Sequence, residues 1–151
     1  MCNMAMLISA LKGRRTRFDE NLPAYGLMED ALFSRQFCAP GECLLVPSAR
    51  GVHLGTKLGR TSGVRMGYSQ IANPIYLSRV GRDFRLSGAL KIAAQSLAAN
   101  ALHSLRPEPY IDRRGRLRGN LLAIRDAIAM RLHPTRIMQL PGSPDPSGSR
   151  L

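Results

Sequence analysis

Two stretches in the second half of the chain carry the clearest helical periodicity. In the first, residues 87–105, apolar side chains recur every three or four positions, and Ser87 stands where a helix could be capped. Its apolar positions are Leu90, Ala94, Leu97, Ala101 and Leu105. In the second, the spacing of 4, 3, 4 and 4 is carried by Leu117, Leu121, Ile124, Ile128 and Leu132. The pattern predicts two amphipathic helices whose aliphatic stripes pack against each other.

The first half of the chain has a different pattern. Residues 18–26 (FDENLPAYG) have turn chemistry, and residues 28–37 predict a short helix that opens with Glu29 and Asp30. Two carboxylates in a first turn suit the positive end of the helix dipole. Residues 43–54 (CLLVPSARGVHL) then read as two short extended pieces, rich enough in Val and Leu for buried strands. The sequence therefore predicts a mixed α/β chain.

The remaining segments are predicted from their composition. Residues 55–67, rich in Gly and Ser, predict a mobile basic loop, and residues 68–79 predict a helix in which Pro74 either makes a kink or begins a new turn. The Pro-rich and basic residues 106–116 read as a linker between the two amphipathic helices. Low complexity predicts disorder from residue 141 onward.

Charge and cysteine content narrow the class of partner and compartment. The 151 residues include 22 Lys and Arg but 10 Asp and Glu, and the net charge of +12 favours polyanions such as nucleic acid, acidic lipid headgroups or phosphorylated substrates. Three irregularly spaced cysteines do not suggest a disulfide framework, which indicates a reducing compartment. The apolar run 4–11 is much shorter than the roughly 20 residues that span a bilayer and does not resemble a signal peptide. We expect a cytoplasmic protein.

Five short motifs occur in an order that resembles a known family. They are Asn3-Met4, Phe18-Asp19-Glu20, Tyr25-Gly26, Glu29-Asp30 and Val52-His53. Together they resemble the later half of family 2 glycosyltransferases of the GT-A type. The stretches GYSQIANPIYLSRVG and RGRLRGNLLAIRDAIAMRL are similar to the helix that follows the His in that family and to its C-terminal helix, so that the resemblance covers residues 2–133.

The resemblance implies a fold and a division of the chain. The fold class is α/β, a partial GT-A-like fold of C-terminal strands and helices with a helical C-terminal extension. Residues 1–82 would be the C-terminal part of the catalytic domain, residues 83–140 the helical extension and residues 141–151 a disordered tail. The implied activity is transfer of a sugar from a nucleotide-sugar to an acceptor in glycan or envelope polysaccharide synthesis.

The resemblance also implies a role for the acidic pair. An inverting sugar transfer needs a base that takes the proton of the acceptor hydroxyl. The resemblance places Asp30 in that role and Glu29 beside it, where Glu29 would orient the site or bind the acceptor. Adjacent helical residues point about 100° apart, so both carboxylates do not readily face one substrate atom. The structural alternative is that both residues simply favour a helix N-terminus.

Three further residues are implied to act on the donor. His53 corresponds to a His that helps to hold a divalent cation, Mg²⁺ or Mn²⁺, against the nucleotide diphosphate, and the alternative is an ordinary His at a strand end. Arg60 and Arg65 follow it and would contact the diphosphate, although a solvated basic loop explains them equally well. The cation is expected only in a complete enzyme.

The chain departs from the family pattern at several positions. Leu32 stands where the family has an acidic residue, Leu7 and Ile8 stand where basic residues usually follow Asn-Met, and no Asp-x-Asp occurs. The chain has no Trp, which excludes processive synthases with a Gln-x-x-Arg-Trp motif. We therefore expect a fragment that is inactive alone and that depends on a missing N-terminal half or on self-association.

Two other classes of function remain open. The net charge of +12 and the Arg-rich residues 106–118 suggest a small basic nucleic-acid-binding protein, although 5% aromatic residues offer few rings for base stacking. The amphipathic segments 87–105 and 117–132 could instead lie on anionic lipid at the cytoplasmic face of the membrane, as a peripheral contact.

Overall fold

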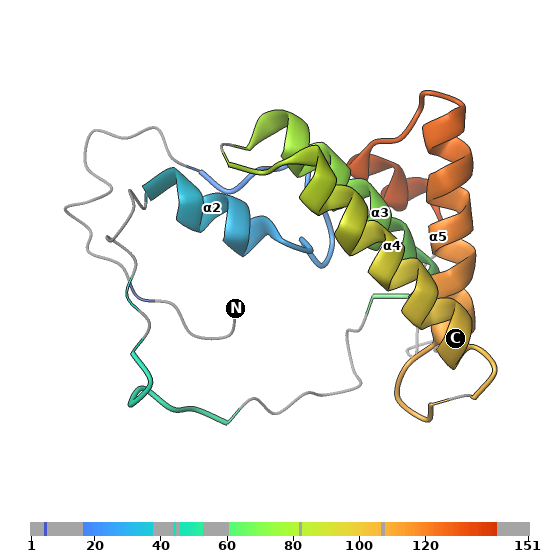
Figure 1. Ribbon diagram of the computed structural model, residues 1–151, viewed down its shortest axis with the longest axis horizontal. Helices are drawn as coiled ribbons and strands as arrows, with labels where there is room; N and C mark the ends of the chain where they lie inside the picture. The colour runs from blue at the N-terminus through green and yellow to red at the C-terminus, as the bar shows by residue number, and fades with distance from the viewer. Residues whose placement is uncertain are drawn as a thin grey trace, which may run out of the picture.

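The described part of the protein is helical. The computed structural model describes residues 5, 17–37, 44, 46–52, 61–81, 83–106 and 108–141. Its elements are α2 (Glu29–Phe37), α3 (Gly63–Val80), α4 (Leu86–His103), α5 (Arg113–Ile128) and a 3-10 helix, η1 (Pro134–Gln139). Helix α3 is central: α4, α5 and η1 all pack against it, and α2 lies at the other end of the molecule from α5 (Figure 1).

Side-chain caps fix the starts of two bundle helices. The Ser62 hydroxyl accepts a hydrogen bond from the Arg65 amide at 3.2 Å and starts α3, and the Asp112 carboxylate accepts one from the Gly115 amide at 2.7 Å and starts α5. Helix α4 begins after Arg85 without a side-chain cap. The prediction that Ser87 caps this helix is therefore wrong, because Ser87 lies inside its first turn.

Glycines bring α3 and α5 into backbone contact. GVRMG and GRLRG each carry two glycines four residues apart, at 63 and 67 in α3 and at 115 and 119 in α5. A Cβ atom on Gly67 would overlap the Arg116 carbonyl, and one on Gly119 would overlap the Val64 carbonyl. The two backbones approach so closely at this crossing that no larger side chain fits between them.

The close crossing decides which faces are buried. The main core consists of Tyr68, Ile71, Ala72, Ala93, Ala123 and Ile137. Helix α4 buries Ala89, Ala93 and Asn100, while Leu90 is 51% exposed and Leu105, just beyond the helix, is 78% exposed. The prediction that the aliphatic stripes of the two helices pack against each other is wrong at these positions, because the inward faces carry small and polar residues.

Helix α5 likewise buries small and polar residues in place of its predicted aliphatic stripe. Its buried residues are Gly115, Gly119, Asn120, Ala123 and Asp126. Leu121 and Ile128, which belong to the predicted core stripe, are 55% and 81% exposed. Because the glycines need the face that touches α3, the leucine and isoleucine side chains are turned towards solvent.

The predicted α/β class is wrong. The described residues form no sheet, and their single bridge joins Glu108 to Ile111 in the connection between α4 and α5. Within the segment 43–54, the described residues Leu44, Val46 and Val52 are more than half exposed, and a turn falls at Pro47 and Ser48. An extended segment is stable only when it pairs with other strands or packs on a core, and the described residues of this segment do neither. The partial GT-A-like fold is therefore not supported.

Helix α3 is longer than its pattern predicts. Residues 63–67, predicted as part of a loop, form its first turns because Ser62 caps them and both glycines face α5. The helix continues through the buried Pro74 to Val80. It belongs to the predicted segment 1–82, yet it packs against α4 and α5, which belong to the predicted segment 83–140. The division into segments 1–82 and 83–140 stays a prediction.

Candidate functional site

A second apolar cluster holds the turn that precedes α2 against the C-terminal half of α3. Leu22, Leu32 and Leu77 are buried together, and Met28, Tyr76 and Phe84 pack against them. The ring of Phe18 stacks on Phe33 with 4.0 Å between the centroids. The FDENL stretch, the EDALF stretch of α2 and the later turns of α3 therefore fold as one unit.

Two side chains of α3 anchor this turn by hydrogen bonds. The Tyr76 hydroxyl donates to Asp19 Oδ2 at 2.8 Å, and the Asn73 amide donates to the Leu27 carbonyl at 2.8 Å. Burial of the ring and the neighbouring Asp19 carboxylate raise the pKa of Tyr76. The carbonyl that Asn73 holds lies two residues before Glu29, so α3 fixes the position at which α2 begins.

The backbone of the turn is strained. Ala24, Gly26 and Met28 have φ angles of 62°, 58° and 70°, in the left-handed region. For the two residues with a Cβ atom, this conformation costs about 1–2 kcal/mol each. A conformation with this cost persists only when its surroundings impose it, and here the apolar cluster and the two anchors do so. Strain of this kind concentrates at functional sites in proteins.

The acidic pair follows directly from this turn. The Glu29 carboxylate lies against Gly26, where any Cβ atom would overlap it, and the Glu29 amide donates to the Gly26 carbonyl at 2.8 Å. Burial, and then the adjacent Asp30 carboxylate, raise the pKa of Glu29. Asp30 Oδ1 accepts a hydrogen bond from the Ala31 amide at 2.8 Å. Both side chains are half-buried.

The structure separates Arg65 from the acidic pair. The Arg65 guanidinium donates to the Leu140 carbonyl at 3.1 and 3.0 Å, and the Ser62 hydroxyl donates to the Pro141 carbonyl at 3.0 Å. These bonds tie residues 140 and 141 to the start of α3. Arg65 lies eleven residues before Tyr76, which is about 16 Å along the helix axis. His53 and Arg60 lie outside the described residues.

The described residues do not supply a metal site by themselves. No group of three or more His, Cys, Asp or Glu side chains with suitable geometry occurs among them. Glu29 and Asp30 offer two carboxylates, which is too few for the oxygen cage that Mg²⁺ or Mn²⁺ prefers. We therefore derive no step of the chemistry through the expected divalent cation.

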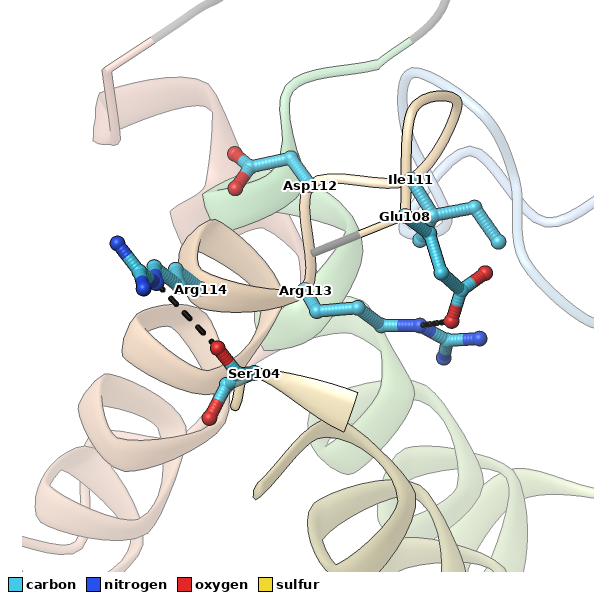
Figure 2. A pocket seen from close by; sticks show the side chains of 6 residues that line it. All are labelled: Ser104, Glu108, Ile111, Asp112, Arg113 and Arg114. Carbon is cyan, nitrogen blue, oxygen red and sulfur yellow. Dashed lines mark hydrogen bonds and ion pairs between the residues drawn. The ribbon is translucent and has the colours of Figure 1, made fainter. Parts of the chain in front are cut away.

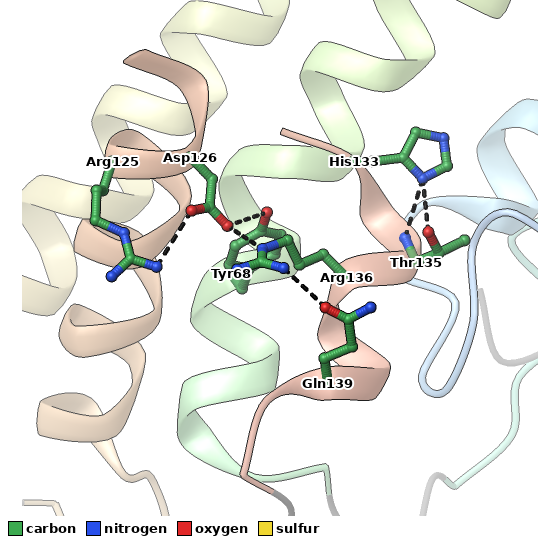
Figure 3. A network of polar contacts seen from close by, with 7 residues as sticks. All are labelled: Tyr68, Arg125, Asp126, His133, Thr135, Arg136 and Gln139. Atoms are coloured by element: carbon green, nitrogen blue, oxygen red, sulfur yellow. Dashed lines mark hydrogen bonds and ion pairs between the residues drawn. The ribbon is translucent and has the colours of Figure 1, made fainter. Parts of the chain in front are cut away.

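The buried carboxylate of Asp126, which the sequence patterns did not single out, binds side chains from α3, α5 and η1 (Figure 3). Asp126 is 1% exposed; it accepts hydrogen bonds from the Tyr68 hydroxyl at 3.1 Å, from Arg125 at 3.2 Å and from Arg136 Nε. Burial alone would raise the pKa of Asp126, but these three donors outweigh it and lower that pKa. A signal was present in the sequence, since Asp126 is the only acidic residue between positions 113 and 140.

The contribution of Tyr68 to stability should be lost at alkaline pH. Burial, followed by the hydrogen bond to Asp126, raises the pKa of Tyr68 to about 12. The unfolded chain ionises near the ordinary value of about 10, so this contribution is complete below that pH and is lost as pH rises towards 12. Urea unfolding between these values should show stability falling more steeply for the wild type than for Tyr68→Phe. Parallel pH profiles would contradict the buried hydrogen bond.

A chain of amides joins the three long helices. The Asn100 amide donates to Gln70 Oε1 and to Asn120 Oδ1, both at 2.8 Å, and the Asn120 amide donates to the Gly67 carbonyl at 2.6 Å. Arg113 approaches Asn100 Oδ1 at 3.4 Å. Polar residues on inward faces are stable here because each donates to a group of a neighbouring helix.

The connection between α4 and α5 forms a small pocket of about 230 Å³ (Figure 2). Arg113 Nε donates to Glu108 Oε1 at 2.8 Å, and Arg114 Nε donates to the Ser104 carbonyl at 3.3 Å. The polar side chains that line the pocket thus bind groups of the connection itself. Residues 113–116, which were predicted as part of a linker, form the first turn of α5. Arg113 and Arg114 of this turn bind the connection between α4 and α5.

Comparison of the chain with protein-family models, with curated proteins and with solved structures finds no match. Among the described helices, none is both long enough and apolar enough to cross a bilayer.

Proposed function

We propose that the chain is the acceptor-side segment of a family 2 glycosyltransferase-like enzyme. In its full-length form the enzyme would transfer a sugar from a nucleotide-sugar to a glycan or lipid-linked acceptor, in glycan or envelope polysaccharide synthesis. We place this activity at the cytoplasmic face of the membrane, as a peripheral protein. The proposal rests on the ordered motifs and on the acidic pair, and it does not require an α/β fold of the described residues.

One observation carries the proposal. Three of the stretches that resemble the family, around Phe18, around Glu29 and, more than forty residues later, around Tyr76, pack into one unit. That unit holds the strained turn at residues 24–28, which directly precedes Glu29 and Asp30 and so determines where they lie. A pair of carboxylates that served only to start a helix would not need this support.

The chemistry assigns different tasks to the two carboxylates. Asp30 takes the proton of the acceptor hydroxyl as that oxygen attacks the anomeric carbon and the nucleoside diphosphate leaves. Glu29, whose pKa is raised by burial and by Asp30, binds and orients a neighbouring hydroxyl of the acceptor. The Glu29 carboxylate lies against Gly26, next to the strained turn, where it can reach an acceptor hydroxyl beside Asp30.

The 151-residue chain alone is expected to show no sugar transfer, because the proposal leaves donor binding to another part of the enzyme. With that part present, as the gene encodes it or added in trans, release of nucleoside diphosphate from a panel of UDP-, GDP- and dTDP-sugars should depend on acceptor. Asp30→Asn should lower that rate by at least about a hundredfold.

The matched control for this prediction is Asp83→Asn. Asp83 is an exposed acid with a φ of 64°, a conformation that asparagine tolerates, and it lies outside the acidic pair. Its replacement should leave the rate unchanged, and unfolding curves should show that both variants are folded. Full activity of Asp30→Asn, or turnover by the isolated chain, would overturn the proposal.

Nucleic-acid binding is not proposed as a second function. Arg113 is paired with Glu108 and Arg114 with the Ser104 carbonyl, so two cations of the Arg-rich stretch have structural partners. Salt-sensitive binding to random oligonucleotides that is lost on replacing Arg113, Arg114 and Arg116 would reverse this judgement.

A further inference from the structure

Helix α4 buries small and polar residues and exposes large aliphatic ones. The buried faces of α4 and α5 consist of glycine, alanine and paired polar residues, and Tyr68 and Ile71 of α3 pack against them. In the predicted core stripe of α4, Leu97 is half-buried, whereas Leu90, Ala94, Ala101 and Leu105 are exposed, together with Leu86. We call these five residues the α4 face. Three of the five are leucines that are more than half exposed.

This arrangement is unusual for helices that pack in water. Water-exposed bundles bury leucine and isoleucine, because removing these side chains from water stabilises the fold. Helices that associate beside lipid instead use small residues and interhelical hydrogen bonds at their contacts, and leave aliphatic side chains outside. The glycine crossing and the Asn100–Asn120 pair are contacts of that second kind.

The sequence around the α4 face contains basic residues but no acidic ones. No Asp or Glu occurs from residue 84 to residue 106, whereas three cations are exposed there: Arg85 and Arg106 beyond the two ends of α4 and Lys91 next to Leu90. In α5, the one acid is Asp126, which is buried and neutralised by Arg136 and Arg125. The Asp, Glu, Lys and Arg side chains of residues 84–106 are therefore all cationic, which favours an anionic partner.

We propose that the α4 face lies on an anionic lipid bilayer, with its leucines in the boundary between headgroups and acyl chains and with Arg85, Lys91 and Arg106 at the lipid phosphates. The contact is interfacial, because α4 lacks the length and apolar character to span. This inference specifies the membrane location proposed above, but it does not depend on sugar transfer or on Asp30.

The charges favour lipid over other occupants. In a symmetric contact between two copies, the cations beside one α4 face would meet the same cations of the other copy, which is unfavourable. Single-stranded nucleic acid binds through aromatic stacking as well as cations, and the α4 face carries only aliphatic side chains. An anionic bilayer satisfies both the aliphatic and the cationic part of the surface.

The test is flotation of the purified 151-residue chain with lipid vesicles in the absence of any nucleotide-sugar. The chain should bind vesicles that contain about one third phosphatidylglycerol and should bind phosphatidylcholine vesicles at least about tenfold more weakly. Leu90→Ser combined with Leu105→Ser should lower the partition constant about tenfold or more. The matched control is Leu44→Ser with Val52→Ser, which removes two apolar groups elsewhere that are even more exposed, and this variant should bind as the wild type does.

A second pair of variants separates local charge from total charge. Replacing Arg85, Lys91 and Arg106 by Gln should weaken binding more than replacing the exposed Arg17, Arg50 and Arg79, although both variants lose three charges. Equal losses, no binding by the wild type, or unchanged binding of the double leucine variant would each overturn the inference. So would a dimer in solution that the double leucine variant turns into monomers, or displacement of the chain from vesicles by a random RNA oligomer. Failure of these tests would leave the assignment of Asp30 unaffected.

Discussion

Replacing Gly119 by alanine is expected to lower the free energy of unfolding by about 2–4 kcal/mol. In an exposed helix position this substitution normally stabilises, because alanine is the better helix former. Here the added Cβ atom would overlap the Val64 carbonyl oxygen and would lie 2.7 Å from the Tyr68 amide nitrogen. These are backbone atoms, which cannot rotate away, so α3 and α5 must separate and the contacts of Tyr68 and Ala123 loosen with them.

Gly88 provides the matched control for that substitution. It lies in α4, is exposed, and has no atom within 4 Å of the position a Cβ atom would take. Gly88→Ala should raise the free energy of unfolding by about 0.5–1 kcal/mol. Urea unfolding followed by circular dichroism measures both changes. If Gly119→Ala proves as stable as Gly88→Ala, the close crossing of α3 and α5 is contradicted.

Replacing Asp126 by alanine is expected to cost about 3 kcal/mol or more at neutral pH, because breaking a buried ion pair leaves its partners without compensation. The Tyr68 hydroxyl, which is buried, loses its acceptor, and Arg136, which is partly exposed, loses its ion pair. Glu20→Ala removes an exposed carboxylate and should change stability by less than about 0.5 kcal/mol.

Acid pH should diminish the effect of Asp126→Ala. The pKa of Asp126 is lowered in the folded protein, so its contribution to stability is complete above the unfolded pKa of about 4 and is lost as pH falls through the folded value. The difference in unfolding free energy between wild type and Asp126→Ala should therefore shrink steadily below that pH. A difference that is independent of pH would mean that Asp126 acts through packing and not through its charge.

The positions of α2 and α4, and in part those of α3 and α5, followed from local patterns in the sequence. The acidic start of α2 at Glu29 was predicted from helix electrostatics, and α2 ends at Phe37 as expected. Helices over the two periodic stretches were also predicted, although α5 begins four residues earlier than its stripe, at Arg113, because Asp112 caps it. These features depend on residues close in sequence, and local propensity was sufficient for them.

The buried faces could not be predicted in this way. The stripe that contains Leu90 and Leu105 has the spacing of a core face, but the contact with α3 is made by Ala89 and Ala93. That choice depends on how closely the helices approach, which the glycines at 67 and 119 decide through backbone contact over fifty residues of sequence. The strands predicted within residues 43–54 failed for a related reason: their apolar content was correct for a strand, but no partner is present in the described residues.

Of the candidate site, the sequence predicted only its position in the fold. Glu29 and Asp30 begin α2 as expected and their roles stay a prediction, whereas Asn73 and Tyr76, which hold the turn before them, were not identified as anchors. The left-handed conformation of Ala24 and Met28 has no signal in the sequence, because neither residue favours it and only tertiary packing imposes it.

Cysteine accessibility tests the reversed packing of the bundle most directly. In a background with Cys2, Cys38 and Cys43 replaced by serine, single cysteines would be introduced at the neighbouring positions Ala89 and Leu90, which are 5% and 51% exposed, and at Ala123 and Leu121, which are 0% and 55% exposed. A maleimide should label Leu90→Cys and Leu121→Cys rapidly, and should label Ala89→Cys and Ala123→Cys only as fast as the bundle opens. Rapid labelling at the alanine positions with protection at the leucine positions would contradict both the fold and the lipid-binding face inferred from it.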